Sequence, residues 1–576
     1  AEYKQAYDNG VNLTNAIKAA YDAGYNSVVL ERGNYPFTYT SDNNPTQNDQ
    51  LGAVKLWGLT SMTVDLNNSV LFAIFDSDNR SPYTKSTTNP YQLGGAVFTF
   101  QDTFGVVLKN GEFRGDCYNR SYVNAAELQT ENTSAILFRR NNRHNEIQKC
   151  KFHGFRADGL AGFASGDSLG VDIRTAMDTW YAGGIDTSTG AEITETGSYR
   201  TAKVDLSGKT ILNNQINIGR FGSLTFRDDY LLIAFYDANS NFLSAEKIVE
   251  TQNIMLPTGT RYVRFVAYKD ERTDPTVSYG SIHLNTGMSQ YLYVVDCEFY
   301  RNMRGCISNL FDNTFIDRCR FFDSGVEKSE VRLYNSSTRY AINFEDVYVG
   351  NLSVTNCEFD NTGSGILAGC RSLTVKSNKF KNLAFSAIGV YTTAFWEATG
   401  NTFYRCDYSL FGISYDNIYI NRYYVFCNNV TMNCGSTSLG FNKFNSKFVF
   451  IHSNNYYFGT PCNLVDAGEG RSIYTHDNVY VDMPNVSVYA AYFFNCASVH
   501  NEQIIDTLTT NNEWMIKSFD TDKVAHNNII KSMTDFIAVR LQANRKSVVK
   551  NVEYTGLNAS SVRAKIADLQ WDASVN

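Results

Sequence analysis

The sequence predicts an all-β fold, a right-handed parallel β-helix, in which short strands stack coil upon coil. Its 576 residues include 37 Tyr and 38 Phe but only 8 Pro, a composition that suits extended sheet. A phrase of the form x-Cys/Asn-x-Phe also recurs through the chain. Its later copies end at Phe299, Phe321, Phe359, Phe380 and Phe403, which are 22, 38, 21 and 23 residues apart. Such a period of about 22 residues is typical of a solenoid of short strands.

The residue two positions before each phenylalanine is Cys or Asn, and it shares a strand face with the ring because side chains alternate along a strand. Stacking then places like residues above one another, with the small thiols filling a narrow interior and asparagines bonding backbone groups at corners. We therefore expect the cysteines of these phrases to be reduced core residues: Cys150, Cys297, Cys319 and Cys357.

The amino-terminal region predicts a cap for the solenoid. Residues 12–23 have the pattern of an amphipathic helix, with Asn12 as its N-cap, and a strand is expected at 27–30. A helix that covers the open end is the usual way to protect a stack of coils.

The coil phrases vanish between about 171 and 284, where alternating runs such as 231–237 and 261–268 are divided by turns. This pattern predicts an inserted antiparallel β-sandwich. The expected organisation is a cap and first coils in 1–170, the inserted module in 171–285, the main β-helix in 286–550 and a C-terminal cap in 551–576. Within the module, Trp180, Tyr236 and Arg264 are possible glycan contacts, although core roles fit them better.

Several partners and cofactors are disfavoured. The formal charge of −7 argues against nucleic acid, which needs a basic surface, and no apolar stretch approaches the length that inserts into a membrane. The histidines are scattered without the spacing of a metal site, and neither a phosphate-binding glycine loop nor a GxSxG motif occurs. We therefore expect no metal and no cofactor.

The chain resembles the bacteriophage tailspike polysaccharide depolymerases of the pectin-lyase-like right-handed β-helix superfamily. The resemblance lies in the opening at 12–35, in the x-Cys/Asn-x-Phe phrases and in the strand at 340–346, and it covers roughly 1–165 and 287–530. It implies a homotrimer on the virion tail that recognises the host cell surface. It also implies binding of bacterial surface polysaccharide, with the inserted module resembling carbohydrate-binding sandwiches.

Cleavage of a glycan by hydrolysis needs a proton donor and a second carboxylate beside the scissile bond. Alignment of the coils makes Ile342 and Phe344 inward, so Asn343 and Glu345 face outward in the middle of the solenoid. We predict Glu345 as the proton donor and Asp346 or Asp312 as the second carboxylate. The simpler alternative is that Glu345 and Asp346 are solvated loop acids or pair with Arg371.

Sugar rings stack on exposed aromatic side chains, and loops beside the strand at 340–346 are placed to wall a groove. The predicted substrate-binding residues are Arg371, Tyr348, Tyr391, Trp396 and Arg332. Each aromatic could instead be buried or lie in a subunit interface.

The leading functional prediction is therefore an endo-acting glycoside hydrolase that depolymerises capsular polysaccharide or exopolysaccharide. A polysaccharide lyase is a second possibility, although such chemistry usually wants a basic residue, Tyr or His. A third is a receptor-recognition spike that binds the glycan without cutting it.

Overall fold

The structure is a computed structural model. It describes residues 2–38, 52–74, 95–115, 117, 133–139, 141–155, 157–162, 181–207, 215–218, 231–248, 253–268, 284–285, 289–308, 311–325, 339–344, 350–390, 393, 395–413, 421–441, 447–466, 473–481, 491–494, 498–500, 502–506, 514–517, 524–526, 529–532, 548–550 and 553–556. These residues form two compact units, one comprising the chain up to 353 together with 369–371 and the other comprising most of the remainder.

A parallel β-helix is confirmed, and one coil of the first unit illustrates its anatomy. Strand β22 (Gln290–Val295) is followed after two residues by β23 (Glu298–Tyr300) and, after a longer connection, by β24 (Ile307–Ser308). Each strand pairs in parallel with its counterpart in the next coil, β22 with β25 (Asp312–Asp317), β23 with β26 (Arg320–Phe322) and β24 with β27 (Tyr340–Phe344). We call these three stacks the first, second and third ladders.

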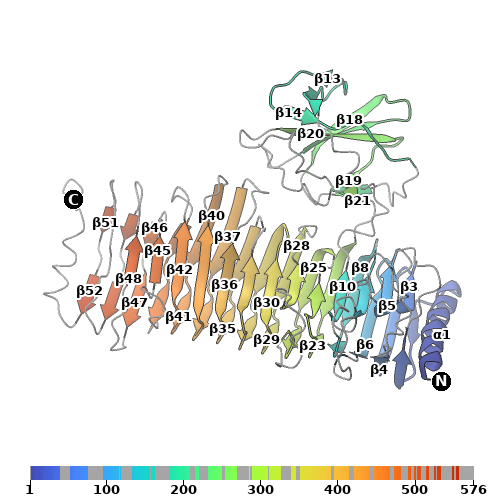
Figure 1. Ribbon diagram of the computed structural model, residues 1–576, viewed down its shortest axis with the longest axis horizontal. Coiled ribbons are helices and arrows are strands. Elements are labelled where there is room, and N and C mark those ends of the chain that lie inside the picture. Colours follow the sequence, from blue (N-terminus) through green and yellow to red (C-terminus); the bar gives the residue numbers. More distant parts are fainter. Residues whose placement is uncertain are drawn as a thin grey trace, which may run out of the picture. The chain divides into compact units, whose positions relative to one another are not determined.

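The first unit contains the earlier members of each ladder (Figure 1). The first ladder starts with β1 (Ser27–Val29), β4 (Thr63–Ala73), β6 (Val107–Arg114) and β8 (Arg143–Gln148). The second ladder starts with β2 (Asn34–Phe37), the later halves of β4 and β6, and β9 (Lys151–His153). The third ladder starts with β3 (Gly52–Trp57), β5 (Gly95–Gln101), β7 (Thr133–Phe138) and β10 (Leu160–Gly162). Strand β28 (Asn351–Thr355) follows β27 in the chain.

The second unit repeats the same three ladders, drawn from yellow to red in Figure 1. The first comprises β31 (Ser372–Lys376), β34 (Phe395–Thr399), β37 (Asn421–Cys427), β40 (Lys447–Ser453), β43 (Ile473–His476), β46 (Ser498–His500), β49 (Val524–His526) and β51 (Val548–Lys550). The second comprises β29 (Glu358–Asp360), β32 (Lys379–Lys381), β35 (Thr402–Tyr404), β38 (Val430–Met432), β41 (Tyr456–Phe458), β44 (Val479–Val481), β47 (Gln503–Asp506), β50 (Ile529–Ser532) and β52 (Glu553–Gly556). The third comprises β30 (Ser364–Ala368), β33 (Ser386–Val390), β36 (Tyr408–Ile413), β39 (Ser436–Phe441), β42 (Cys462–Asp466), β45 (Ala491–Phe494) and β48 (Trp514–Lys517). Parallel pairing therefore continues to Gly556, inside the segment predicted as a C-terminal cap.

The predicted capping helix is present, but it begins earlier than expected. Helix α1 spans Glu2–Asp22 and packs against β2 and β3, so Asn12 lies inside the helix and is not its N-cap. Its buried stripe starts with Ala6 and continues through Gly10 and Leu13 to Ile17. A Cβ on Gly10 would lie 2.5 Å from the carbonyl oxygen of Ala53, so only glycine allows this close approach. Small residues on the first turns carried little apolar signal, which is why the sequence pattern placed the start too late. Among the described residues, no helix is long and apolar enough to cross a membrane.

The insertion is antiparallel, as predicted. One sheet pairs β11 (Tyr181–Ala182), β14 (Ser198–Arg200), β20 (Tyr262–Tyr268), β17 (Leu231–Tyr236) and β18 (Phe242–Ile248), with β15 (Val204–Asp205) beside β20. A second pairs β19 (Asn253–Met255), β16 (Gln215–Ile218) and β21 (Leu284–Asn285), and β12 (Gly184–Ile185) forms a hairpin with β13 (Glu192–Ile193). Tyr236 is buried and donates to the carbonyl oxygen of Gly190 at 3.0 Å, while Arg264 is paired with Glu192 at 2.9 Å. Both therefore have the structural roles that the sequence favoured, and Trp180 lies outside the described residues.

The interior is built from columns of like residues, as the phrase predicts. Phe113, Phe152, Phe299 and Phe321 stack in the first unit with ring centroids 4.9–5.0 Å apart. The predicted core cysteines, Cys150, Cys297, Cys319 and Cys357, are all buried, which confirms their interior role.

In the second unit, after Cys357 in its first coil, the cysteine position is taken over by a ladder of buried asparagines. These are Asn378, Asn401, Asn429, Asn455 and Asn478. The side-chain amide nitrogen of each of the first four donates to the carbonyl oxygen of the next asparagine side chain at 2.9–3.1 Å. Each also donates to a backbone carbonyl of the preceding coil, as Asn429 does to Ala398 at 3.0 Å. Buried polar groups are stable only when bonded in this way, so the amides bind the coils to one another.

Candidate functional site

Asp312 is the predicted catalytic carboxylate that the structure describes. It opens β25 on the inward-facing set of that strand, together with Thr314 and Ile316, and only 4% of its surface is exposed. Its carboxylate accepts a hydrogen bond from the backbone N–H of Gly350 at 2.9 Å.

Burial decides the protonation of Asp312. Removal from water raises the pKa of its carboxyl to about 6, although backbone N–H groups, led by that of Gly350, and the positive charge of Arg371 oppose this rise. A carboxyl group with such a pKa still holds a proton in mildly acidic solution. It is therefore suited to give that proton to a leaving group and to take it back in a later step.

Arg371, predicted to bind substrate, is brought into electrostatic range of Asp312. It lies directly before β31, is partly buried and therefore remains in contact with solvent. A guanidinium beside a buried acid can hold an anionic or hydroxyl-rich ligand next to the proton donor.

The other predicted catalytic residues, Glu345 and Asp346, lie in the segment 345–349, outside the described residues. Both flanks of this segment are described. The carbonyl oxygen of Phe344 accepts from the N–H of Gly369 at 2.6 Å, and Gly350 donates to Asp312. Gly350, the first described residue after this segment, thus contacts Asp312, and the predicted grouping of Glu345 and Asp346 with Asp312 stays a prediction. Tyr348, Tyr391 and Arg332 also lie outside the described residues.

Trp396 does not offer a surface for sugar, so this prediction is wrong. The side chain is 3% exposed and stacks on Tyr424 and Phe450 with centroids 5.3 and 5.6 Å away. Trp396 pairs in register with Leu373, an inward position of the preceding coil, and alternation along β34 turns Phe395 outward instead. A comparison with the inward Leu373 and Val375 could have revealed this orientation from the sequence.

Asn343 and Ser308 are polar residues that the sequence reasoning did not assign to the site. They are partners in register on β27 and β24, and they face outward because Ile342 and Phe344 are fully buried inside, as predicted. Both are nevertheless buried, and within the described structure the polar atoms of their side chains have no hydrogen-bond partner. A polar pair opposite each other on the outer face of an otherwise apolar strand pair was the signal that could have identified them.

A metal centre is not formed by the described residues, since no three His, Cys, Asp or Glu side chains among them are grouped to hold an ion. The described part of the site is thus an acid, Asp312, with a nearby cation, Arg371, and the backbone N–H of Gly350. The chemistry available to these groups is acid–base catalysis by carboxyl groups.

No protein-family model matches the chain, and no curated protein matches it either. Among solved structures, PfbA, a surface adhesin of Streptococcus pneumoniae, is 9% identical over 95% of this chain and 88% of its own, with a TM-score of 0.33. Tailspike gp61 of Pseudomonas phage phi297 is 10% identical over 74% of this chain and 66% of its own, with a TM-score of 0.27. The catalytic domain of a GH87 alpha-1,3-glucanase is 10% identical over 62% and 82%, with a TM-score of 0.26. Because these identities and scores are low, we argue the function from the chain's own residues.

Proposed function

We propose that the protein is a phage tailspike depolymerase that cleaves bacterial capsular polysaccharide or exopolysaccharide by endo-glycosidic hydrolysis. The single observation that carries the proposal is Asp312, a buried carboxyl group whose pKa is raised to about 6 on a parallel β-helix. The sequence resemblance to tailspike depolymerases supports the substrate class. Together they favour acid-assisted cleavage of a glycosidic bond.

In this proposal the two carboxyl groups have different catalytic roles. Asp312 holds the proton and gives it to the departing sugar oxygen, and Glu345 or Asp346 acts as the ionised partner. This assignment exchanges the roles expected from the sequence, because burial makes Asp312 the better proton carrier. Arg371 would orient the sugar beside Asp312 through hydrogen bonds from its guanidinium group.

The first test is mass spectrometry of the products formed from a panel of bacterial capsular polysaccharides. Hydrolysis predicts short oligosaccharides heavier by one water for each bond cut. Products that lack this water and carry an unsaturated end would establish a lyase. Binding without shortening of any polymer would establish a recognition spike.

Variants then assign the residues. Asp312→Asn and Glu345→Gln are each expected to abolish cleavage while the glycan is still retained. The matched control is Asp296→Asn, which removes a carboxylate that pairs with Arg318 at the surface of the same unit and should leave the rate unchanged. Full activity in Asp312→Asn would overturn the proposed proton donor.

We further propose that the chain assembles as a homotrimer through an apolar outer face of the second unit. Phe395, Tyr423 and Val449 are neighbours in register on β34, β37 and β40, and all three are exposed. Tyr456, Phe458 and Tyr474 continue the exposed apolar set on β41 and β43. Exposed apolar surface of this kind marks subunit interfaces.

Light scattering on the purified chain tests this assembly. A mass three times that of the 64.8 kDa chain is expected, and Tyr423→Lys should lower it. Tyr293→Lys serves as the control, because Tyr293 is an exposed aromatic residue of the first unit that stacks on Phe315. A monomeric mass at micromolar concentration would reject the trimer.

A further inference from the structure

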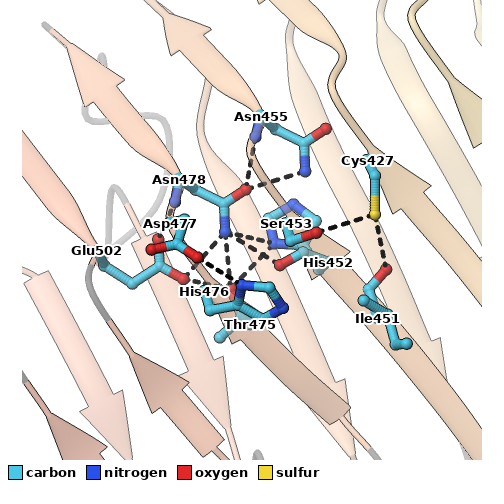
Figure 2. Close-up of polar contacts among 10 residues, drawn as sticks. All are labelled: Cys427, Ile451, His452, Ser453, Asn455, Thr475, His476, Asp477, Asn478 and Glu502. Carbon is cyan, nitrogen blue, oxygen red and sulfur yellow. Dashed lines mark hydrogen bonds and ion pairs between the residues drawn. The ribbon is translucent and has the colours of Figure 1, made fainter.

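The asparagine ladder of the second unit ends on a buried acid, Glu502 (Figure 2). Its two carboxyl oxygens accept from the backbone N–H of Asn478 at 3.1 Å and from the side-chain amide of Asn478 at 3.0 Å. These are the two bonds that each asparagine oxygen accepts from the residue before it. Glu502 thus takes the acceptor position of the next amide but has no N–H of its own with which to continue the ladder.

Glu502 is also connected to a buried histidine through one hydroxyl group. Thr475 donates from its hydroxyl to Glu502 at 2.5 Å, and the Nδ1 of His452 lies 3.0 Å from the same Thr475 oxygen. The Nε2 of His452 lies 2.6 Å from the Tyr457 hydroxyl. The side-chain amide of Asn478 also lies 3.3 Å from Nδ1 of His452, so which ring nitrogen carries the proton depends on which of these contacts is made. Either tautomer is a neutral imidazole.

Both ends of this chain lie in the core, where an added charge is costly. His452 is fully buried and Glu502 is 1% exposed, so ionisation of either group places a charge away from water. The hydrogen bonds from Thr475 and from the side chain and backbone N–H of Asn478 favour the charged form of Glu502, but burial outweighs them. The low-energy state has a protonated Glu502 and a neutral His452.

We propose that the buried pair Glu502 and His452, joined through Thr475, is a proton-linked lock. It holds the coils around β43, β44 and β47 closed in mildly acidic solution and lets them open at lower and at higher pH. Opening these coils exposes both side chains to water, where each can ionise freely. The proposal does not depend on the enzymatic activity.

The remaining described titratable groups around the pair act in the same direction as burial but less strongly: the charge of His476 lowers the pKa of His452, and that of Asp477 raises the pKa of Glu502. Tyr457 and Tyr480 are buried, and burial raises the pKa of each phenol well above its usual value, so both stay neutral. Cys462 is a buried thiol on β42, and His476 pairs with Asp477 at 2.8 Å where both are partly exposed.

The pH window follows from the two pKa shifts. Burial raises the pKa of Glu502 from 4.5 to about 8, so closure weakens as the pH rises between these values. Burial lowers the pKa of His452 from 6.5 to about 3, so closure weakens as the pH falls between these values. The two trends cancel between pH 4.5 and pH 6.5. The coils therefore open more easily only above pH 6.5 and below pH 4.5. One proton changes an equilibrium tenfold per pH unit, so opening should increase about 30-fold between pH 6.5 and 8.

Hydrogen exchange of the full chain, read by mass spectrometry and corrected for the intrinsic exchange rate, measures this opening. Peptides covering β43 and β44 should lose protection about 30-fold between pH 6.5 and 8. In Glu502→Gln, which does not titrate and whose single amide oxygen can still accept from the Asn478 side chain and Thr475, protection should stay constant over that range. Asp477→Asn removes a nearby surface acid and should keep the wild-type loss.

His452→Asn provides an independent check if the first variant folds poorly. Without the opposing histidine, protection should already fall as the pH rises from 4.5 to 6.5, a range in which the wild type is flat. Protection in the wild type that does not change between pH 6.5 and 8, or an unchanged slope in Glu502→Gln, would overturn the proposal.

Discussion

The two units of the β-helix fill the same corner of the coil with different chemistry. In the first unit, Cys297 donates weakly to the carbonyl oxygen of Val295 in its own corner at 3.3 Å and to Ile147 at 3.5 Å. In the second unit, Asn429 bonds the coils on both sides, donating to Asn455 and accepting from Asn401 at 3.0 Å each. A buried thiol mainly fills space and needs no matching group in the next coil, whereas each amide needs the amides of the coils before and after it as hydrogen-bond partners. Damage should therefore stay local in the first unit and spread in the second.

The largest effect is expected from breaking the amide ladder with Asn429→Leu. This change leaves the backbone N–H and side-chain amide of Asn401 without their acceptor inside the core. We expect a loss of roughly 3–5 kcal/mol in the free energy of unfolding, measured with urea at pH 6. The control is Asn428→Gly, because Asn428 is exposed and has a positive φ of 56° that glycine also adopts. Similar losses in both variants would contradict the special role of the ladder.

The buried acid of the first unit should reveal itself through pH. Asp312 has a pKa raised by burial from 3.8 to about 6, so its contribution to stability is lost as the pH rises between these values. Asp312→Asn does not titrate, and it should be more stable than the wild type above pH 6 by up to about 3 kcal/mol and equal to it below pH 4. Thermal unfolding of both proteins between pH 4 and pH 6 and above shows whether the variant is the more stable one at the higher pH, as expected. A gain in stability together with lost cleavage is the pattern of a residue kept for function.

Exchanging the two chemistries sharpens the comparison further. Cys319→Ala should cost about 1 kcal/mol, since it removes one small buried group. Cys319→Asn should cost about twice as much, although it introduces the residue on which the second unit depends, because a lone amide has no matching amide above it. Urea unfolding of both variants compares their losses in the free energy of unfolding. If Cys319→Asn were stabilising, a single buried amide would not need a partner amide in the next coil.

The smallest effect is expected at the surface. Arg318 pairs with Asp296 at 2.8 Å and with Asp317, and these side chains are partly or mostly exposed. Arg318→Gln should change the free energy of unfolding by less than about 1 kcal/mol, with the difference shrinking in salt. A larger loss that persists at high salt would indicate that these charges are part of a buried network.

The coil period could be predicted from the sequence because each phrase occupies one corner and recurs at the coil length. The start of α1 could not, since Ala6 and Gly10 are too small to show in an apolar pattern. Asp312 was identified as a candidate by its place in the coil, but the N–H that its carboxylate binds belongs to Gly350, a residue 38 positions later. Trp396 was misjudged because a shift of one residue along a strand exchanges inside for outside. Glu502 occupies an asparagine position in the phrase, and that substitution was a readable signal.

The corner between the first and second ladders is two residues long in coil after coil. The first of the two residues usually has the left-handed backbone conformation. Asp296, Arg318, Asn356 and Ser377 all have φ of 51–58° at this point, directly before the Cys or Asn. A residue added or lost there would move every inward side chain of the following strand outward. The connections on either side of the third ladder vary in length, for example from three residues between β29 and β30 to 21 between β4 and β5. Insertions and deletions can thus accumulate beside the third ladder, so that the surface offered to a ligand can change while the stacked interior stays in register.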